Sequence, residues 1–178
     1  MGKPGKEKII KEFVIVVDTR EQEPFMFDKM VYKPLPAGDY TAGYPLSRNL
    51  RDGEGRLLTF EKLIAIERKR IPELFAVCGR ERERFENELK KLSLLQYKYI
   101  VIEGNLADIT KSQYGYVTPK VVLSSLCSWA IKYGVSFIFA GRSARSVVYK
   151  LLEFFVKYNI LGFKTIEEFE RISRWEAI

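Results

Sequence analysis

The segment Ile66-Glu67-Arg68-Lys69 constrains the fold of this chain more than any other. It is charged, yet it continues the apolar run 63–66, as the end of a buried strand does. Because side chains alternate between the two faces of a strand, Glu67 and Lys69 point to one face and Arg68 to the other. A carboxylate and an ammonium group lose hydration energy at such a place, and stability alone rarely accounts for them. We therefore expect a functional site here.

A second carboxylate beside this pair would complete a site for a divalent metal, with the lysine holding or polarising a water molecule. Asp39, in Gly38-Asp39-Tyr40, is the candidate. The chain contains no histidine, which excludes histidine-bound metals, catalytic triads and imidazole acid–base chemistry. Oxygen ligands favour Mg²⁺, with Mn²⁺ as a substitute, over zinc. The two cysteines, Cys78 and Cys127, match no zinc or redox spacing.

The composition is that of one globular domain with a basic surface. The chain has 178 residues, 47% of them hydrophobic, and a formal net charge of +7. The charge favours a polyanionic partner, because lysine and arginine release counterions when they neutralise phosphates. The N-terminus resembles no signal segment and no apolar run is long enough to span a bilayer, so we expect a cytoplasmic protein, or a nuclear one in a eukaryote. We expect residues 1–12 to form a basic flexible tail, 13–160 the domain, and 161–178 a helical extension of it.

Hydrophobic periodicity predicts an α/β fold of three layers, with a central mixed sheet flanked by helices. The predicted strands are 13–17, 39–42, 57–69, 97–103 and 135–139, and 31–36 is an edge strand or a connection because prolines interrupt it. The predicted helices are a first turn at Pro72 followed by 80–95, then 118–133, 143–158 and 165–175. Thr118 is the expected N-cap of the apolar helix that Gly134 closes.

The acidic residues and Lys69 follow a recognisable order. Asp-(x)n-Glu-x-Lys, here Asp39, Glu67 and Lys69, is the pattern of the PD-(D/E)xK nuclease superfamily. Three strings in order, 16–21 (Val-Val-Asp-Thr-Arg-Glu), 38–40 (Gly-Asp-Tyr) and 66–69 (Ile-Glu-Arg-Lys), resemble the nuclease domain of the XPF/Hef family of structure-specific endonucleases. Gly79-Arg80 and the strand Tyr99 to Gly104 resemble further parts of that domain. The resemblance extends from about Phe13 to Tyr158.

The resemblance implies a restriction-endonuclease-like fold and Mg²⁺-dependent cutting of branched or flapped DNA, as in repair and recombination. Asp39 and Glu67 would bind the metal, and Lys69 would position or activate water. Asp18 would be an additional ligand or a supporting acid. The remaining candidates are Arg20 and Arg68, which would contact phosphate or hold the carboxylates in place, Glu21 as a weaker candidate at the end of the first motif, and Arg80 as a DNA contact.

Two features depart from the family's pattern. The aspartate usually found four residues past the lysine is replaced by Glu73, which we expect to act at most in an outer shell. The stretch between Asp39 and Glu67 is also longer than expected, and its excess, 44–56, carries three arginines. This excess is either a hairpin that contacts DNA or a solvated loop.

The resemblance also implies an assembly and leaves two alternative functions open. Family nuclease domains dimerise through their C-terminal helices, so we expect 118–158 to form a homodimer or heterodimer face. One alternative is an inactive subunit that binds DNA or serves as a scaffold. The other is a different PD-(D/E)xK nuclease that acts on linear duplex DNA, although this would not account for the string 16–21.

Overall fold

The computed structural model describes residues 12–45, 57–112, 114 and 116–160. Its strands are β1 (Val14–Asp18), β2 (Met30–Lys33), β3 (Tyr40–Pro45), β4 (Leu57–Thr59), β5 (Ile64–Arg70), β6 (Tyr97–Glu103) and β7 (Ser136–Phe139). Its helices are α2 (Ile71–Cys78), α3 (Arg82–Ser93), α4 (Leu106–Lys111), α5 (Pro119–Tyr133) and α6 (Ala144–Phe155). A short 3-10 turn, η2 (Gly141–Ser143), precedes α6, and a wider π-type turn, η3 (Val156–Ile160), follows it.

All the described strands join in one mixed sheet, in the order β2-β1-β3-β5-β6-β7, with β4 beside β3. Strand β1 is parallel to β2 and antiparallel to β3, and β3 is antiparallel to both β4 and β5. From β5 to β7 the strands are parallel, and helices form the connections between them, as right-handed crossovers require. The carboxyl ends of β5, β6 and β7 therefore lie along one edge of the sheet.

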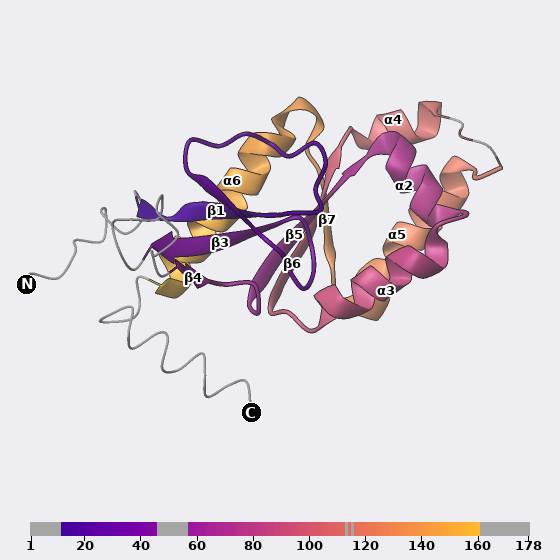
Figure 1. The fold of residues 1–178 in the computed structure, drawn as a ribbon. Coiled ribbons are helices and arrows are strands. Elements are labelled where there is room, and N and C mark those ends of the chain that lie inside the picture. The colour runs from indigo at the N-terminus through magenta and orange to yellow at the C-terminus, as the bar shows by residue number, and fades with distance from the viewer. Residues whose placement is uncertain (1–11, 46–56, 113, 115, 161–178) are drawn as a thin grey trace, which may run out of the picture.

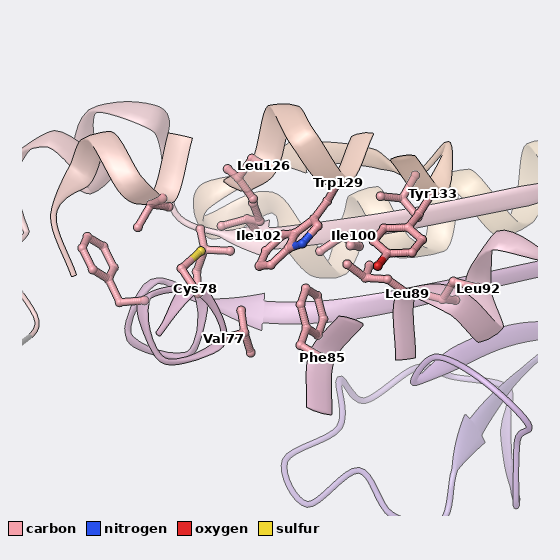
Figure 2. Packing of buried hydrophobic residues seen from close by; sticks show 14 of the residues in the cluster. Val77, Cys78, Phe85, Leu89, Leu92, Ile100, Ile102, Leu126, Trp129 and Tyr133 are labelled. Carbon is pink, nitrogen blue, oxygen red and sulfur yellow. The ribbon is translucent and has the colours of Figure 1, made fainter. Parts of the chain in front are cut away.

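Helices cover the sheet on both sides (Figure 1). Successive residues of β5 separate between the two cores, since Ile64 and Ile66 pack on the α6 side and Ala65 packs on the side of α2, α3 and α5. Figure 2 shows the core on the side of α2, α3 and α5, where Phe85 of α3 and Trp129 of α5 point toward each other, with ring centroids 5.2 Å apart. The predicted three-layer α/β architecture is therefore confirmed.

Most predicted elements are present with small changes in their bounds. The helix predicted at 80–95 is shorter, because Gly79 and Arg80 belong to the turn after α2. Helix α4 was not predicted, although Asn105 and Asp108 form a capping box at its start. The tail 1–11, most of the insertion 44–56 and the predicted helix 165–175 lie outside the described residues. Across the residues that are described, no helix has the length and apolar character to cross a membrane.

A polar contact joins α3 to α5 at the margin of the core on the side of these helices. The fully buried Trp129 donates its indole Nε1–H to Glu86 Oε1 at 3.1 Å, and the Tyr133 hydroxyl donates to Glu86 Oε2 at 3.1 Å. Arg82 pairs with the same carboxylate at 3.0 Å. The hydrogen bond from Trp129, with those from Tyr133 and Lys132, lowers the pKa of Glu86 to about 2. This carboxylate supplies the acceptor that a buried indole requires.

We predict that Glu86→Ala lowers the free energy of unfolding by about 2 kcal/mol at pH 7, because the Trp129 N–H loses its acceptor. The pKa of Glu86 is lower in the folded state than its ordinary 4.5, so its contribution is complete above about pH 4.5 and is lost as the pH falls toward 2. Urea denaturation should therefore show a smaller difference in the free energy of unfolding between wild type and variant at pH 3 than at pH 7. Glu83→Ala, at an exposed position of α3, is the control. Equal stability of the two variants at pH 7 would contradict the prediction.

Candidate active site

Main-chain hydrogen bonds bring together three acidic residues that the sequence places far apart. Asp18 ends β1, Asp39 immediately precedes β3, and Glu67 lies in the second half of β5. The Asp18 N–H donates to the Asp39 carbonyl at 2.8 Å, and the Asp39 N–H donates to the Ile66 carbonyl at 2.9 Å. The strand ends that carry the predicted site residues are thus joined in one continuous hydrogen-bonded series.

Gly38 makes this junction possible. Its φ of 71° lies in the left-handed region that side chains disfavour. A Cβ at this position would also lie 3.0 Å from Ala65 Cβ and 3.1 Å from the Ile66 carbonyl oxygen. Only glycine allows the chain to turn tightly against β5 and to present Asp39 beside Glu67. The Gly-Asp-Tyr string therefore has a structural reason as well as a chemical one.

The three acids and Lys69 line one open cleft of about 340 Å³. Its other lining residues come from the loop after β1, from Gly38, from the start of α2 and from the inner face of α3: Arg20, Glu21, Gln22, Glu23, Gly38, Arg70, Glu73, Arg84, Phe85 and Glu88. The cleft therefore has an acidic floor at the strand ends, with arginine side chains around it. This is the arrangement that the sequence predicts for Asp39, Glu67 and Lys69.

Asp39, Glu67 and Lys69 form the centre of the cleft. Asp39 Oδ2 accepts a hydrogen bond from the Arg68 N–H at 2.7 Å, which fixes the carboxylate against β5. Lys69 Nζ pairs with Glu67 Oε1 and lies 3.2 Å from the Arg68 carbonyl oxygen. The Lys69 ammonium also lies 5.4 Å from the centroid of the Phe85 ring, so α3 helps to hold it in place.

The electrostatics of this group favour a bound cation. Burial, followed by the charge of Glu67, raises the pKa of Asp39 well above its ordinary value. Burial by itself would lower the pKa of Lys69, but the Glu67 and Asp39 carboxylates outweigh it, and the net direction is upward. Lys69 is therefore an ammonium ion at neutral pH. One lysine faces two carboxyl groups, and burial makes their negative charge unfavourable unless a cation balances it.

Asp18 is already satisfied by neighbouring groups. It is 2% exposed, and its carboxylate accepts hydrogen bonds from the Arg20 main-chain N–H at 2.7 Å and from the Leu35 N–H at 3.1 Å. The Arg20 guanidinium also binds both Asp18 oxygens, at 2.9 and 2.5 Å. Burial would raise the pKa of Asp18, but these hydrogen bonds outweigh it and lower the pKa. Asp18 thus orients Arg20, which remains largely exposed at the cleft.

The other sequence-predicted residues differ in their positions. Glu21 and Glu73 line the cleft, and Glu73 also accepts the Arg70 N–H at 2.7 Å as part of the capping box of α2. Arg68 points to the opposite face of β5, as its place in the strand predicts, and contacts Glu103 and Glu21. Arg80 is 83% exposed, pairs with Glu81 at 3.7 Å and is not among the residues that line the cleft.

Four charged residues that line the cleft were not predicted from the sequence: Glu23, Arg70, Arg84 and Glu88. The charges of the run 80–84 alternate in sign, a pattern that by itself indicates a solvated helix face with local ion pairs. Arg84 and Glu88, however, lie four residues apart and so share one face of α3, with Phe85 next to it. This spacing could have placed Arg84 and Glu88 near the strand ends from the sequence, because Phe85 belongs to the apolar stripe of α3 that must face the sheet.

The donor set fits a hard divalent cation. Mg²⁺ is usually held by one or two carboxylates together with waters and substrate phosphates. Asp39 and Glu67 supply two carboxylates from rigid strand ends in one cleft. Within the described part of the chain, no group of three or more acidic, cysteine or histidine side chains is arranged to hold a metal by itself. The residues present therefore fit a metal that water and a phosphate help to complete.

A larger hollow of about 550 Å³ lies elsewhere, between α4 and α5, and is lined by residues of the range 110–119. The described residues of its lining include Lys111 but no carboxylate. Its described lining holds no carboxylate, cysteine or histidine that could bind a metal, so the cleft at the strand ends is the better candidate for a metal site.

We predict that Asp39→Asn stabilises the protein in the absence of metal, by about 1 kcal/mol at pH 7, because it removes a charge whose burial is unfavourable. A carboxyl group whose pKa is raised in the folded state lowers the free energy of unfolding fully at pH values above that raised pKa, and not at all below its ordinary pKa of 3.8. The stability that Asp39→Asn gains at pH 7 should therefore vanish as the pH falls to 4. Thermal unfolding in a chelator measures this. Adding Mg²⁺ should raise the Tm of the wild type but not of the variant. A lower Tm for the variant in the chelator would contradict the prediction.

Comparison with known proteins shows the family and the fold of this chain. Two solved structures, XPF from Aeropyrum pernix alone and in complex with DNA, match with TM-scores of 0.57 and 0.55. Each is 17% identical to this chain, so the likeness concerns the fold alone. The alignments cover 79% and 78% of this chain and 60% and 62% of the XPF chains. This chain therefore spans less than two thirds of the XPF chains that it matches. No curated protein matches the sequence. The ERCC4 domain model matches residues 17–149, and the chain therefore belongs to the ERCC4 nuclease-domain family, whose members are typically endonucleases.

Proposed function

We propose that this protein is an Mg²⁺-dependent endonuclease that hydrolyses phosphodiester bonds in branched or flapped DNA. The observation that carries the proposal is the convergence of Asp39, Glu67 and Lys69 in one cleft beside exposed arginines. Family membership supports the reaction type, and the net charge of +7 supports a polyanionic substrate. The solved XPF structure with DNA is evidence for that protein's substrate and makes DNA the first substrate to test.

The metal would be held by Asp39 and Glu67. When bound there, Mg²⁺ would supply a water of lowered pKa and positive charge beside the scissile phosphate. Asp39 keeps its orientation through the Arg68 N–H, so its oxygen is aimed before the metal arrives. Glu67 would have to exchange part of its contact with Lys69 for the cation.

Lys69 acts in this scheme as a positive charge. Because its pKa is raised by the carboxylates around it, it keeps its proton at neutral pH and is a poor general base. It can hold the attacking water by donating a hydrogen bond, and it can stabilise negative charge that develops on the phosphate. Its support by the Phe85 ring limits its movement, which favours such a fixed electrostatic role.

The arginines at the cleft would bind the DNA backbone. Arg20 is held from behind by Asp18, and its guanidinium is 64% exposed, so it is oriented and yet accessible to a phosphate. Arg84 of α3 is 75% exposed on another part of the lining. Asp18 would thus act through Arg20, and Glu21 and Glu73 would shape the lining. Arg80, next to α3, would contact a more distant phosphate.

We predict that Asp39→Ala and Lys69→Ala each lower the rate of cleavage by at least 10² to 10³, the usual effect of losing one group that stabilises the transition state. The measurement uses labelled flap, fork, Holliday-junction and linear duplex substrates with Mg²⁺. Lys90→Ala, which removes an exposed charge of α3 outside the cleft, is the matched control for Lys69→Ala and should cleave as the wild type does.

The same experiment separates the alternative functions. Equal cutting of linear and branched DNA would favour a nuclease for linear duplex and contradict the proposed substrate. No cutting at all, together with no heat of Mg²⁺ or Mn²⁺ binding in calorimetry, would favour an inactive DNA-binding or scaffold subunit. Cutting of branched DNA that Asp39→Ala leaves unchanged would place the chemistry elsewhere.

We also propose that 118–158 form a dimer face. Ile131 of α5 is 89% exposed, an unusual position for a large apolar side chain, and Val121 of the same helix is also exposed. Strand β7, at one end of the described sheet order, carries half-buried residues such as Phe137. A second copy of the chain, or a related partner, would cover these groups.

We predict that Ile131→Lys weakens this dimer, because it places a charge in an apolar interface. Light scattering during size-exclusion chromatography, over a range of protein concentrations, measures the effect. Leu94→Lys is the matched control, since Leu94 is 84% exposed at the end of α3 and lies outside 118–158. A wild-type protein that remains monomeric at every concentration would contradict the proposal.

A further inference from the structure

We infer that Arg68 is a positioning residue that fixes the loop 21–27 as one wall of the cleft, rather than a group that binds a phosphate. The inference deepens the proposed function and rests on it for its kinetic consequences. From the sequence, Arg68 was expected to contact phosphate or to hold the carboxylates in place, and its side-chain contacts point instead to the loop 21–27.

The first observation is the direction and burial of the side chain. Arg68 lies on the face of β5 opposite Glu67 and Lys69, and its side chain is 9% exposed. Its guanidinium pairs with Glu103 at the end of β6 through Nε and with Glu21 at 3.4 Å through Nη1. Two carboxylates therefore already balance its charge. A phosphate entering the cleft would meet Arg20 or Arg84 instead, since neither is buried.

The second observation concerns the loop between β1 and β2. Glu21, Gln22 and Glu23 line the cleft, so the position of this loop decides the shape of one wall. Its main-chain groups bond to side chains: the Glu23 carbonyl accepts from Arg68 Nη1, and the Phe25 N–H donates to the Tyr40 hydroxyl at 3.0 Å. A loop held in this way depends on the side chains that it contacts.

The Arg68 side chain, which is 9% exposed, supports this loop from inside the protein. Its guanidinium carbon lies 4.5 Å from the centroid of the Phe25 ring, and that ring stacks on Tyr40 with centroids 5.9 Å apart. On the outer side, Arg70 pairs with Glu23 at 2.9 Å, but this pair is exposed and correspondingly weak. Removing the Arg68 side chain therefore takes away the contacts of the loop with this position of β5 and leaves Tyr40 and Arg70 as the remaining supports named here.

The same residue serves the metal carboxylate through its main chain. The Arg68 N–H donates to Asp39, and this hydrogen bond survives any substitution of the side chain except proline. Replacing the side chain should therefore leave the affinity for Mg²⁺ unchanged while releasing the loop. A displacement of about 1 Å in a positioning group lowers rates by as much as 10²-fold. The expected signature is a lower kcat with unchanged metal affinity.

The test uses the double variant Arg68→Gln/Glu103→Gln, compared with Glu103→Gln alone. The paired change avoids leaving a carboxylate without its partner at the end of β6, which would destabilise the fold by itself. Phe25→Ala is the second variant, because it releases the loop from the other side and keeps the Arg68–Glu103 pair. Lys62→Gln, in the exposed turn before β5, controls for the loss of a positive charge.

Limited digestion with a glutamate-specific protease reports the loop without any nuclease activity. We expect cleavage after Glu21 and Glu23 to become at least tenfold faster in the double variant and in Phe25→Ala, and to stay unchanged in Glu103→Gln and Lys62→Gln. Equal digestion rates in all the variants would overturn the inference. This arm decides the matter even if the wild type cuts no DNA, in which case the proposed function fails by itself.

Salt dependence and kinetics separate positioning from phosphate binding. A phosphate contact would reduce the slope of log K against log [salt] by about one when Arg68 is replaced, and would raise KM without lowering kcat. We expect instead an unchanged slope, a kcat lowered about tenfold or more, and the same Mg²⁺ affinity in calorimetry. A reduced slope with unchanged kcat would overturn the inference and return Arg68 to the DNA contacts.

Discussion

The series of main-chain hydrogen bonds from Asp18 through Asp39 to Ile66 is the constraint on which the site depends. It joins the end of β1, the start of β3 and the middle of β5 without using any side chain. Gly38 allows the close approach that these bonds require. Because main-chain groups make this junction, it does not depend on the acidic side chains. The position of the acids is thus a property of the sheet, which the two hydrophobic cores stabilise from both sides.

The charged groups of this site are balanced to different degrees. Asp18 has Arg20 and two main-chain donors, and Arg68 has two carboxylates. Asp39 and Glu67 are balanced by the Arg68 N–H and by Lys69, and burial together with the charge of Glu67 still raises the pKa of Asp39. Buried charges that lack compensation destabilise a fold, so such a pair is the expected mark of a functional position. A divalent cation is the simplest compensation.

The two faces of β5 contact different parts of the protein at residues 67–69. Glu67 and Lys69 face α3 and the cleft, while Arg68 faces the loop after β1 and the end of β6. One short motif therefore provides both the reactive groups and the support of a neighbouring wall. Alternation along a strand is the physical reason, since a residue between two positions that face the cleft must point the other way.

The sequence by itself determined the α/β class, most element bounds and the central residues Asp39, Glu67 and Lys69, because hydrophobic periodicity, glycine turns and charged strand ends are local signals. It did not determine the part played by Arg84 and Glu88, or the direction of Arg68's contacts. Those depend on which helix packs over which strand end, and on loops that side chains hold. Such contacts join residues far apart in the chain, so only the tertiary structure decided them.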